Sequence, residues 1–403
     1  MRAFFLIPLL PPNLPFTPYI PLRHNVSSIG NNQYRKEILT SRAVSNLKFR
    51  IRAVLVLLFL CAALMGCGGS SNKYVYTVGQ SAEGIFAFKI SSSGQLTFIT
   101  GAPFSTGGRP TAIAIMPSKT FGFVASAGGL TVGGTQTGGV VGYSFTSKTG
   151  GLSIANAALN TGANPVSLAI DPSSQHLYVL SQGSSNISAF SIDSFTGVLT
   201  PLNGSPFPTV AAPVSMAMAP SGGALYVVSP TQGISAIAIN ADGTLGTASA
   251  PLPAGTSPRF VTVDPGNHFV YVADSAGNAV LGFSVSGTSL TAMSGSTATG
   301  TAPDALAINP DGNLLFVANS GSNNVSVFSI GSGGALTPAQ GSPVSTGTAP
   351  AFVMTDRSGH LFVADSGSND LSVFSIGGSG SLTAVSGSPF AVQTSASWIA
   401  IVD

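Results

Sequence analysis

Short apolar runs alternate with clusters of Gly, Pro, Asn and Ser from about residue 73 to the end of the chain. In the segment that begins at Pro165, the runs span residues 166–170, 177–180, 187–192 and, more weakly, 199–202. They are rich in β-branched and aromatic residues and are bounded by turn residues, which is typical of β-strands. No stretch after residue 72 keeps helical spacing over three turns, so we predict an all-β domain.

This four-run segment occurs six times, at intervals of about 45 residues. A unit of this kind cannot bury its apolar faces alone and needs neighbours of the same kind. Four antiparallel strands per unit, repeated around an axis, form the blades of a β-propeller. Each copy starts at a proline that precedes the first run: Pro110, Pro165, Pro213, Pro258, Pro303 and Pro350.

The two ends of this region complement each other. Residues 396–401 match a first strand, and the chain then ends. The missing runs lie at the other end, at residues 74–77, 85–90 and 96–99. We therefore predict a seven-bladed β-propeller over residues 73–403, with four antiparallel strands per blade and one blade closed by both termini. Closure leaves no free edge for pairing with another chain, whereas a β-solenoid, the alternative, would need capping ends.

Residues 48–66 have the pattern of a signal peptide, in which basic residues precede an apolar segment of about 13 residues that is too short to span a membrane. Residues 64–67, Leu-Met-Gly-Cys, resemble the lipobox of bacterial lipoproteins, whose cysteine becomes the lipidated first residue of the mature protein. We expect Cys67 to carry lipid and residues 67–72 to form a tether. An ordinary signal peptide or an anchor helix is the alternative.

This reading predicts an exported protein that is anchored to a bacterial membrane through its lipid. Gly68 stands where an inner-membrane retention Asp would stand, which favours the outer membrane. Residues 1–47 are Pro-rich and show no periodic pattern. We interpret them as an unstructured extension or as an over-extended start of the reading frame.

The charge of the chain is unevenly distributed. The formal charge is +2, but eight of the 15 basic residues precede residue 53. From Cys67 onward there are 7 basic and 12 acidic residues, so we expect no basic patch and no nucleic-acid partner. The two cysteines are Cys61, which leaves with the signal peptide, and Cys67. The propeller therefore has no disulfide, and we expect a monomer stabilised by burial between blades.

Propeller ligands commonly bind at one mouth of the central channel. We expect that face to be built from the loops that enter the first strands and the hairpins between second and third strands. The charged residues beside the leading prolines are Arg109, Arg259 and Asp304. They could converge on a polar ligand or remain solvated loop charges. A small molecule, a glycan or an envelope protein is the partner expected at this face.

Polar residues also end the second strands, where Asp274, Asn319 and Asp365 each follow Val-Ala. Such a ring could hold a divalent cation, but no Asp-x-Asp-x-Asp-Gly spacing accompanies it. We favour Asx turns that open the next hairpin, and we predict no metal and no cofactor. The histidines of the domain recur at one turn of the repeat, so they are spread around the ring: His176, His268 and His360.

The first full copy is longer than the others. Residues 126–139 are rich in glycine and replace a four-residue hairpin. The insertion would overhang the expected ligand face, either as a flexible lid or as a tolerated loop.

The segments Leu314–Phe328 and Phe269–Asp274 resemble the YVTN-type repeat of seven-bladed propellers that are grouped with the 6-phosphogluconolactonase-like lactonase family. The resemblance covers residues 73–403 and implies this fold and, as an activity, hydrolysis of the carboxylic ester bond of a sugar lactone. Family lactonases show Pro-Arg-His before a first strand and Asn-Glu after a second strand. Here Phe260 follows Arg259 in place of the His, and Asp274 and Ser275 replace Asn-Glu.

Two functions from different classes follow. We prefer an envelope lipoprotein whose propeller binds or scaffolds without catalysis, because no general base or paired carboxylate is evident to activate water. The alternative is a lactone hydrolase that uses Arg259 with Asp274 or Asp304. Charged groups within hydrogen-bond reach of one another at the channel mouth would favour the enzyme, whereas a rim of Ser, Thr and Gly would favour the binding protein.

Overall fold

The computed structural model describes residues 72–79, 81, 83–132 and 135–403. The extension, the signal peptide and Cys67 lie outside the described residues, so their assignments stay predictions. In the part that is described, no helix is long and apolar enough to cross a membrane. Ser71–Asp403 forms one compact unit, and its first and last strands pair with each other.

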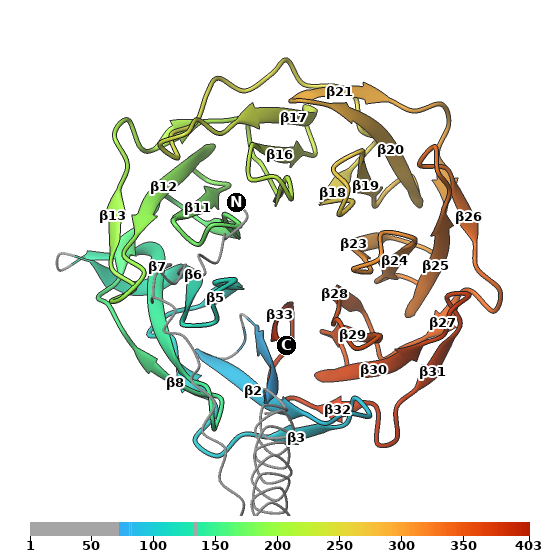
Figure 1. The fold of residues 1–403 in the computed structure, drawn as a ribbon, viewed down its shortest axis with the longest axis horizontal. Coiled ribbons are helices and arrows are strands. Elements are labelled where there is room, and N and C mark those ends of the chain that lie inside the picture. Colours follow the sequence, from blue (N-terminus) through green and yellow to red (C-terminus); the bar gives the residue numbers. More distant parts are fainter. Residues whose placement is uncertain (1–71, 80, 82, 133–134) are drawn as a thin grey trace, which may run out of the picture. The chain divides into compact units, whose positions relative to one another are not determined.

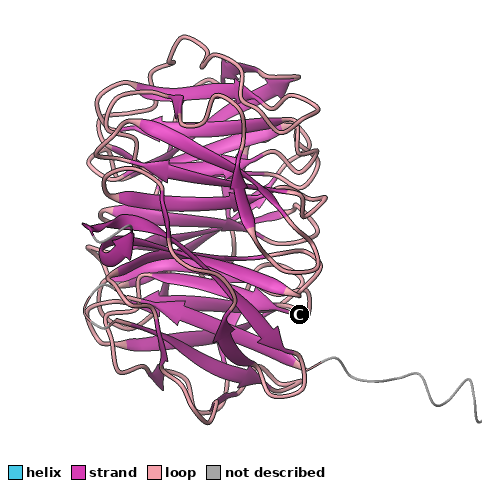
Figure 2. Cartoon of the chain, turned by 90° about the vertical axis from the view of Figure 1, so that its left-hand side faces the viewer, coloured by secondary structure: helices cyan, strands magenta, loops and turns pink. Residues whose placement is uncertain are grey.

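The described residues form seven antiparallel sheets arranged as blades around a central axis (Figure 1). This confirms the predicted seven-bladed propeller. Seen from the side, the ring consists of strands, and its loops gather on two opposite faces (Figure 2).

Six blades have the same plan: three long strands, then an outer strand in two short pieces that both pair with the third strand. Blade 1 contains β5 (Pro110–Ile115), β6 (Phe121–Val132), β7 (Thr135–Thr146), β8 (Gly151–Ile154) and β9 (Leu159–Asn160). Blade 2 contains β10 (Pro165–Ile170), β11 (His176–Ser181), β12 (Asn186–Ile192), β13 (Leu199–Pro201) and β14 (Phe207–Pro208). Blade 4 contains β18 (Pro258–Val263), β19 (Phe269–Asp274), β20 (Ala279–Ser286), β21 (Ser289–Ala292) and β22 (Thr297–Ala298).

The remaining blades of this plan continue along the chain. Blade 5 contains β23 (Pro303–Ile308), β24 (Leu314–Asn319), β25 (Asn324–Ile330), β26 (Leu336–Pro338) and β27 (Val344–Ser345). Blade 6 contains β28 (Pro350–Thr355), β29 (His360–Asp365), β30 (Asp370–Ile376), β31 (Leu382–Ala384) and β32 (Phe390–Ala391). Blade 7 contains β33 (Trp398–Val402), β1 (Lys73–Val78), β2 (Gly84–Ile90), β3 (Leu96–Phe98) and β4 (Phe104–Ser105).

Blade 7 joins the two ends of the domain. Its innermost strand is β33, which pairs with β1 from Tyr74 opposite Val402 to Val78 opposite Trp398. In Figure 1 the blue N-terminal strands lie beside the red C-terminal strand. The predicted closure by both termini is therefore confirmed.

Blade 3 departs from the predicted four strands. It has β15 (Ser215–Met218), β16 (Ala224–Ser229) and β17 (Gly233–Ala238), and its outer edge is held only by isolated bridges from Ile234 to Leu252 and from Ile239 to Leu245. Pro251 and Pro253 flank Leu252 and lack the N–H groups that a regular ladder needs.

The core lies between blades and is densest at the second strands, which are buried on both faces. Every residue of β16 and β24 is buried. Three buried tyrosines on second strands also donate hydrogen bonds to glycine carbonyls of the next blade: Tyr76 to Gly150, Tyr178 to Gly243 and Tyr271 to Gly334, at 2.8–2.9 Å. These bonds lock neighbouring blades together while satisfying buried hydroxyls.

On the face where first strands end, buried Asp and Asn side chains organise the turn to the second strand. Asp356, for example, accepts hydrogen bonds from the backbone N–H groups of Ser358 and His360 at 2.9 and 2.7 Å. We call these equivalent residues the turn ring: Asp171, Asp264, Asn309 and Asp356.

The opposite end of five first strands carries a β-bulge. The register of the first and second strands shifts directly after the leading proline, so the next residue has no partner. Bulges of this kind re-aim a side chain. The bulged residues are Thr111, Val166, Arg259, Asp304 and Ala351.

Outside residues 133 and 134, the described part of the glycine-rich segment 126–139 contains a paired β-ribbon. Strands β6 and β7 extend into it, and Leu130, Thr131 and Val132 pair with residues 137, 136 and 135. Backbone ladders need no side chains, so the glycines do not prevent pairing.

Candidate functional site

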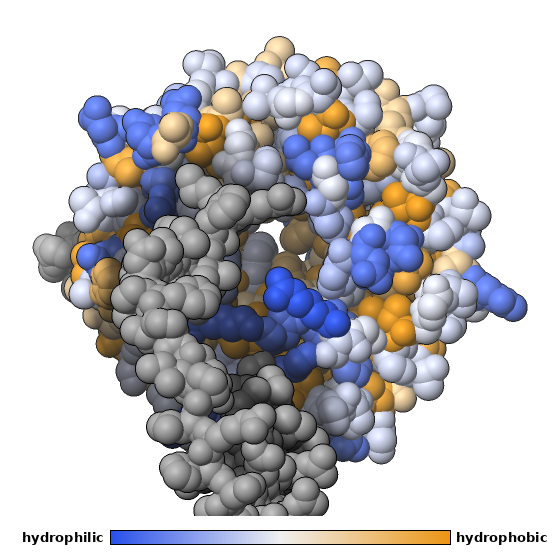
Figure 3. Space-filling view, viewed as in Figure 1, coloured by the Kyte–Doolittle hydropathy of each residue, from blue (hydrophilic) through white to orange (hydrophobic). Residues whose placement is uncertain are grey.

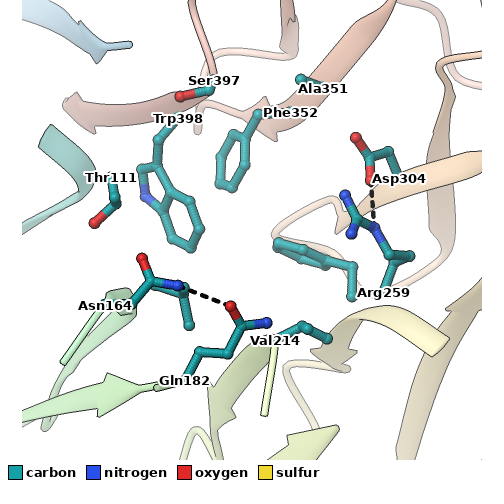
Figure 4. Close-up of a pocket in the computed structure, with 12 residues that line it drawn as sticks. Thr111, Asn164, Gln182, Val214, Arg259, Asp304, Ala351, Phe352, Ser397 and Trp398 are labelled. Carbon is teal, nitrogen blue, oxygen red and sulfur yellow. Dashed lines mark hydrogen bonds and ion pairs between the residues drawn. The ribbon is translucent and has the colours of Figure 1, made fainter. Parts of the chain in front are cut away.

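A pocket of about 330 Å³ lies at the channel mouth where the first strands begin (Figure 4). Every blade contributes the same position to its wall, namely the residue after the leading proline or its equivalent. We call this set the mouth ring: Thr111, Val166, Val214, Arg259, Asp304, Ala351 and Ser397. In five of the seven blades, this residue is the bulged one, and the bulge turns its side chain toward the axis.

Two members of the mouth ring form an ion pair. Nε of Arg259 donates to Oδ1 of Asp304 at 3.1 Å, and the two side chains are 49% and 23% exposed. The residues lie in neighbouring blades at the same repeat position, which brings them together across 45 residues of sequence. An exposed pair adds at most about 1 kcal/mol to stability, so it contributes little to the fold.

Three aromatic side chains from blades 4, 6 and 7 lie beneath the ion pair. Phe352 and Trp398 have ring centroids 4.5 Å apart, and Phe260 lies 5.7 Å from Phe352 and 6.3 Å from Trp398. All three line the pocket, and Phe352 and Trp398 are labelled in Figure 4. We call them the aromatic floor.

The far wall is polar and uncharged. Nδ2 of Asn164, in the loop that enters blade 2, donates to Oε1 of Gln182, in the hairpin after β11, at 2.8 Å (Figure 4). Both loop classes expected to build the ligand face therefore reach the pocket. The hydroxyl of Thr111 donates to the carbonyl of Pro165 at 2.8 Å and so ties blade 1 to blade 2.

Asp274, a candidate catalytic residue, does not line this pocket. Its carboxylate is buried and accepts hydrogen bonds from the backbone N–H groups of Thr256 and Ser257 at 2.8 and 2.7 Å. It thus holds the loop that enters its own blade. The two bonded residues, Thr256 and Ser257, lie three and two positions before Arg259. The expected Asx turn into the following hairpin is replaced by this contact with the preceding loop.

The equivalents of Asp274 are likewise buried in their blades. Nδ2 of Asn319 donates to Oδ1 of Asn324 at 2.8 Å and to Oγ of Ser326 at 2.9 Å. Oδ2 of Asp365 accepts from the N–H of Ser372 at 3.2 Å. Burial raises the pKa of Asp365 to about 7, and the charge of nearby Asp370 adds to the shift. Among the described residues, no three His, Cys, Asp or Glu side chains are grouped so as to hold a metal.

Arg109 lies at the base of the glycine-rich ribbon and is not among the residues that line the pocket. It is exposed, and its backbone N–H donates to the carbonyl of Gly128 at 2.9 Å. Of the three charged residues beside leading prolines, the structure brings Arg259 and Asp304 together and leaves Arg109 apart.

Each histidine of the described domain pairs with the turn-ring aspartate of its own blade. The Nδ1 to Oδ2 distances are 3.1 Å for His176 and Asp171, 3.6 Å for His268 and Asp264, and 2.9 Å for His360 and Asp356. These pairs belong to turns at the strand ends opposite the mouth pocket.

The aromatic floor was not predicted from the sequence, in which residues 396–401 are recognisable only as a first strand. The sequence nevertheless contains a sign of it, because residue size varies strongly at the second position after each leading proline or its equivalent. That position is small in four blades and aromatic in three: Ala112, Ser167, Ser215, Phe260, Ala305, Phe352 and Trp398.

Comparison with known families and structures adds a second line of observation. Residues 130–209 and 283–399 match the family model described as Lactonase, 7-bladed beta-propeller. Comparison with curated proteins gives no match.

Similar solved structures share the whole ring. A putative 6-phosphogluconolactonase from Bacteroides uniformis is 18% identical, with a TM-score of 0.71 over 82% of this chain and 99% of that chain. One from Bacteroides fragilis is 18% identical, with a TM-score of 0.70 over 83% and 99%. The periplasmic gluconolactonase of Pseudomonas aeruginosa is 19% identical, with a TM-score of 0.67 over 82% and 99%. At these identities the likeness concerns the fold.

Proposed function

We propose, from the premise that this chain is a lactonase-like seven-bladed propeller, that its mouth pocket hydrolyses a lactone ring. The observation that carries the proposal is the contact of 3.1 Å between Arg259 and Asp304 in an open pocket. The sequence favoured a binding protein because no acid–base pair was evident. The bulges supply a base and an electrophilic partner side by side, which moves the preference to the enzyme.

The chemistry requires two groups. The Asp304 carboxylate takes a proton from water as its oxygen attacks the lactone carbonyl carbon. N–H groups of Arg259 that do not bind Asp304 donate to the carbonyl oxygen and stabilise its developing negative charge. The ring C–O bond then breaks, and the leaving oxygen takes the proton back from Asp304. One water and one lactone give one hydroxy acid, and the carboxylate regains its charge.

The aromatic floor has a separate task. Phe260, Phe352 and Trp398 present apolar surface beneath the ion pair, against which a ring can pack. This contact fixes the position of the lactone ring relative to Arg259 and keeps bulk water from one face of the lactone.

The test is hydrolysis by residues 71–403, the compact unit, with δ-valerolactone, gluconolactone and 6-phosphogluconolactone as substrates. We expect Arg259→Ala to lower kcat/KM at least about a hundredfold, in line with the loss of an oxyanion donor. Arg109→Ala is the matched control, because this arginine lies outside the pocket, and it should change kcat/KM less than twofold. Absence of turnover on every lactone, or turnover unchanged in Arg259→Ala, would overturn the proposal.

Binding without turnover is the second candidate, in an envelope lipoprotein anchored at Cys67. The observation in its favour is that Phe260 stands where family lactonases carry a histidine. Saturable quenching of Trp398 fluorescence by a lactone that is recovered intact would support it. Export and outer-membrane attachment are proposed with either function, and loss of membrane association in Cys67→Ser cells tests them.

A further inference from the structure

A second cavity, of about 600 Å³, lies beyond the aromatic floor and has no part in the reaction proposed above. Most of its lining is aliphatic and comes from six blades. We call it the apolar chamber, and its walls include Ile115, Ala217, Leu306, Ile308, Met354 and Ile401.

Small residues keep this chamber open. The centre of the first strand is alanine in several blades, and Ala114, Ala217 and Ala307 line the chamber. Larger side chains at these positions would fill it.

The chamber exposes apolar surface that the fold does not use. Ile115, Ile308, Met354 and Ile401 are only half-buried, although a core would bury them fully. Exposed apolar surface costs about 25 cal/mol per Å², so several such side chains around one cavity are an unused source of binding energy. Concave apolar lining with a few convergent polar groups is the usual composition of a ligand site.

The chamber and the mouth pocket adjoin. Phe260, Phe352 and Trp398 line both cavities, so the aromatic floor is their common wall. The three rings come from blades 4, 6 and 7, whereas blades 1, 2, 3 and 5 carry only Ala or Ser at the same position. The space-filling view along the axis shows the ring hollowed at its centre (Figure 3). A chain attached to a ligand in the mouth pocket can therefore run past the floor into the chamber.

We propose that the apolar chamber holds an aliphatic chain carried by the lactone, so that the substrate is an alkyl-substituted lactone. The inference rests on the proposed hydrolysis at the mouth pocket. Charge at the mouth agrees with it, because Arg259 and Asp304 are the charged residues among those that line the pocket and they offset each other. A phosphate dianion would find no net positive charge there.

Binding is measured first, without any reaction. Trp398 is the only tryptophan of the chain and lies at the junction of the two cavities, so its fluorescence reports on both. Cyclohexanones with 2-alkyl chains of two to ten carbons resemble the lactones but cannot be hydrolysed. We expect each added methylene to tighten binding roughly threefold until the chamber is filled.

Turnover is measured with δ-lactones that carry the same chains. Ala217→Leu and Ala307→Leu fill the chamber from two blades, and we expect both to remove the gain with chain length while δ-valerolactone is still hydrolysed. Met354→Gln keeps the volume but makes the wall polar, and it should weaken binding of the ten-carbon ketone at least tenfold. Ala250→Leu, on an exposed loop, is the matched control and should change nothing.

The outcomes separate the two proposals. Affinity that is independent of chain length, or a chain-length gain that survives Met354→Gln and the filling variants, would overturn the chamber assignment and leave the hydrolase standing. Ketone binding that tightens with chain length, with no hydrolysis of any lactone, would overturn the hydrolase and support the chamber. Because Met354→Gln adds no bulk, it tests the chamber even if a filling variant fails to fold.

Discussion

The two ends of the innermost strands differ in how far their residues repeat from blade to blade. At the turn ring, four blades place Asp or Asn at one position and use it for the same backbone hydrogen bonds. At the mouth ring, seven blades carry six residue types at one position. The turn ring has a geometric task that recurs in each blade, whereas the mouth ring surrounds one pocket with a different group on each side. In this propeller, the residues that repeat hold turns, and the residues that vary line the pocket.

The largest effect should come from Asp304→Asn at the mouth ring. Loss of the proposed base should lower kcat/KM about a thousandfold, within the range of general-base catalysis. The melting temperature should stay within about 2 °C, because an exposed pair contributes little to stability. Parallel kinetics and thermal melts check both. A variant that loses stability together with activity would break the division between the two rings.

The complementary change is Asp356→Ala at the turn ring. This side chain is fully buried, holds two backbone N–H groups and pairs with His360. Although burial opposes its ionisation, hydrogen bonds from His360 and the charge of Lys73 hold the pKa of Asp356 below its ordinary value. Its removal should lower the free energy of unfolding by about 3 kcal/mol, as when a buried pair is broken. Urea denaturation measures this, and kcat per folded molecule should not change.

A smaller effect on stability is expected at the end of the second strand, where blade 5 carries Asn319 and blade 6 carries Asp365 at the equivalent position. Because its pKa is raised to about 7, folded Asp365 holds its proton more tightly than the unfolded chain does. Stability should therefore fall as pH rises from about 4 to 7 and then level off. Asp365→Asn should remove this slope and be the more stable protein at pH 8. Urea unfolding of the wild type and of Asp365→Asn at pH 5 and pH 8 measures this. An equal change of unfolding free energy with pH in the two proteins would contradict a raised pKa for Asp365.

The smallest effect should come from His268→Ala. The side chain is 73% exposed and lies 3.6 Å from Asp264, so the pair is worth less than about 0.5 kcal/mol. His360→Ala, at a buried pair in the same ring, provides the comparison in the same denaturation experiment. A loss at His268 as large as that at His360 would show that burial does not set the value of these pairs.

Patterns that repeat were predictable from the sequence. Strand type, blade number and closure by both ends follow from apolar runs and turn residues that recur in each copy. Arg259 and Asp304 were recognisable as unrepeated charges. Their contact was not, because it depends on bulges that turn both residues toward the axis, and the bulges became evident only from the register of the first and second strands.

Other features depended on contacts that sequence does not specify. Asp274 has backbone N–H groups on either side of it, and only the fold decides that the preceding loop comes closer. The ribbon at 126–139 was taken for a loop because glycine is a poor strand former, although its flanking strands continue the pairing. The outer edge of blade 3 has the apolar residues of a strand but too few N–H groups for a ladder.

The strand that closes the ring also completes the site. Trp398 begins β33, whose partner β1 lies more than 300 positions earlier in the chain. Pairing across such a separation is slow to form, because the ends of a long loop must first meet. The pairing of β33 with β1 therefore closes the ring and places Trp398 in the pocket in one step. A ring that is not closed lacks Trp398 in its aromatic floor, so the complete pocket forms only when the two ends of the propeller pair.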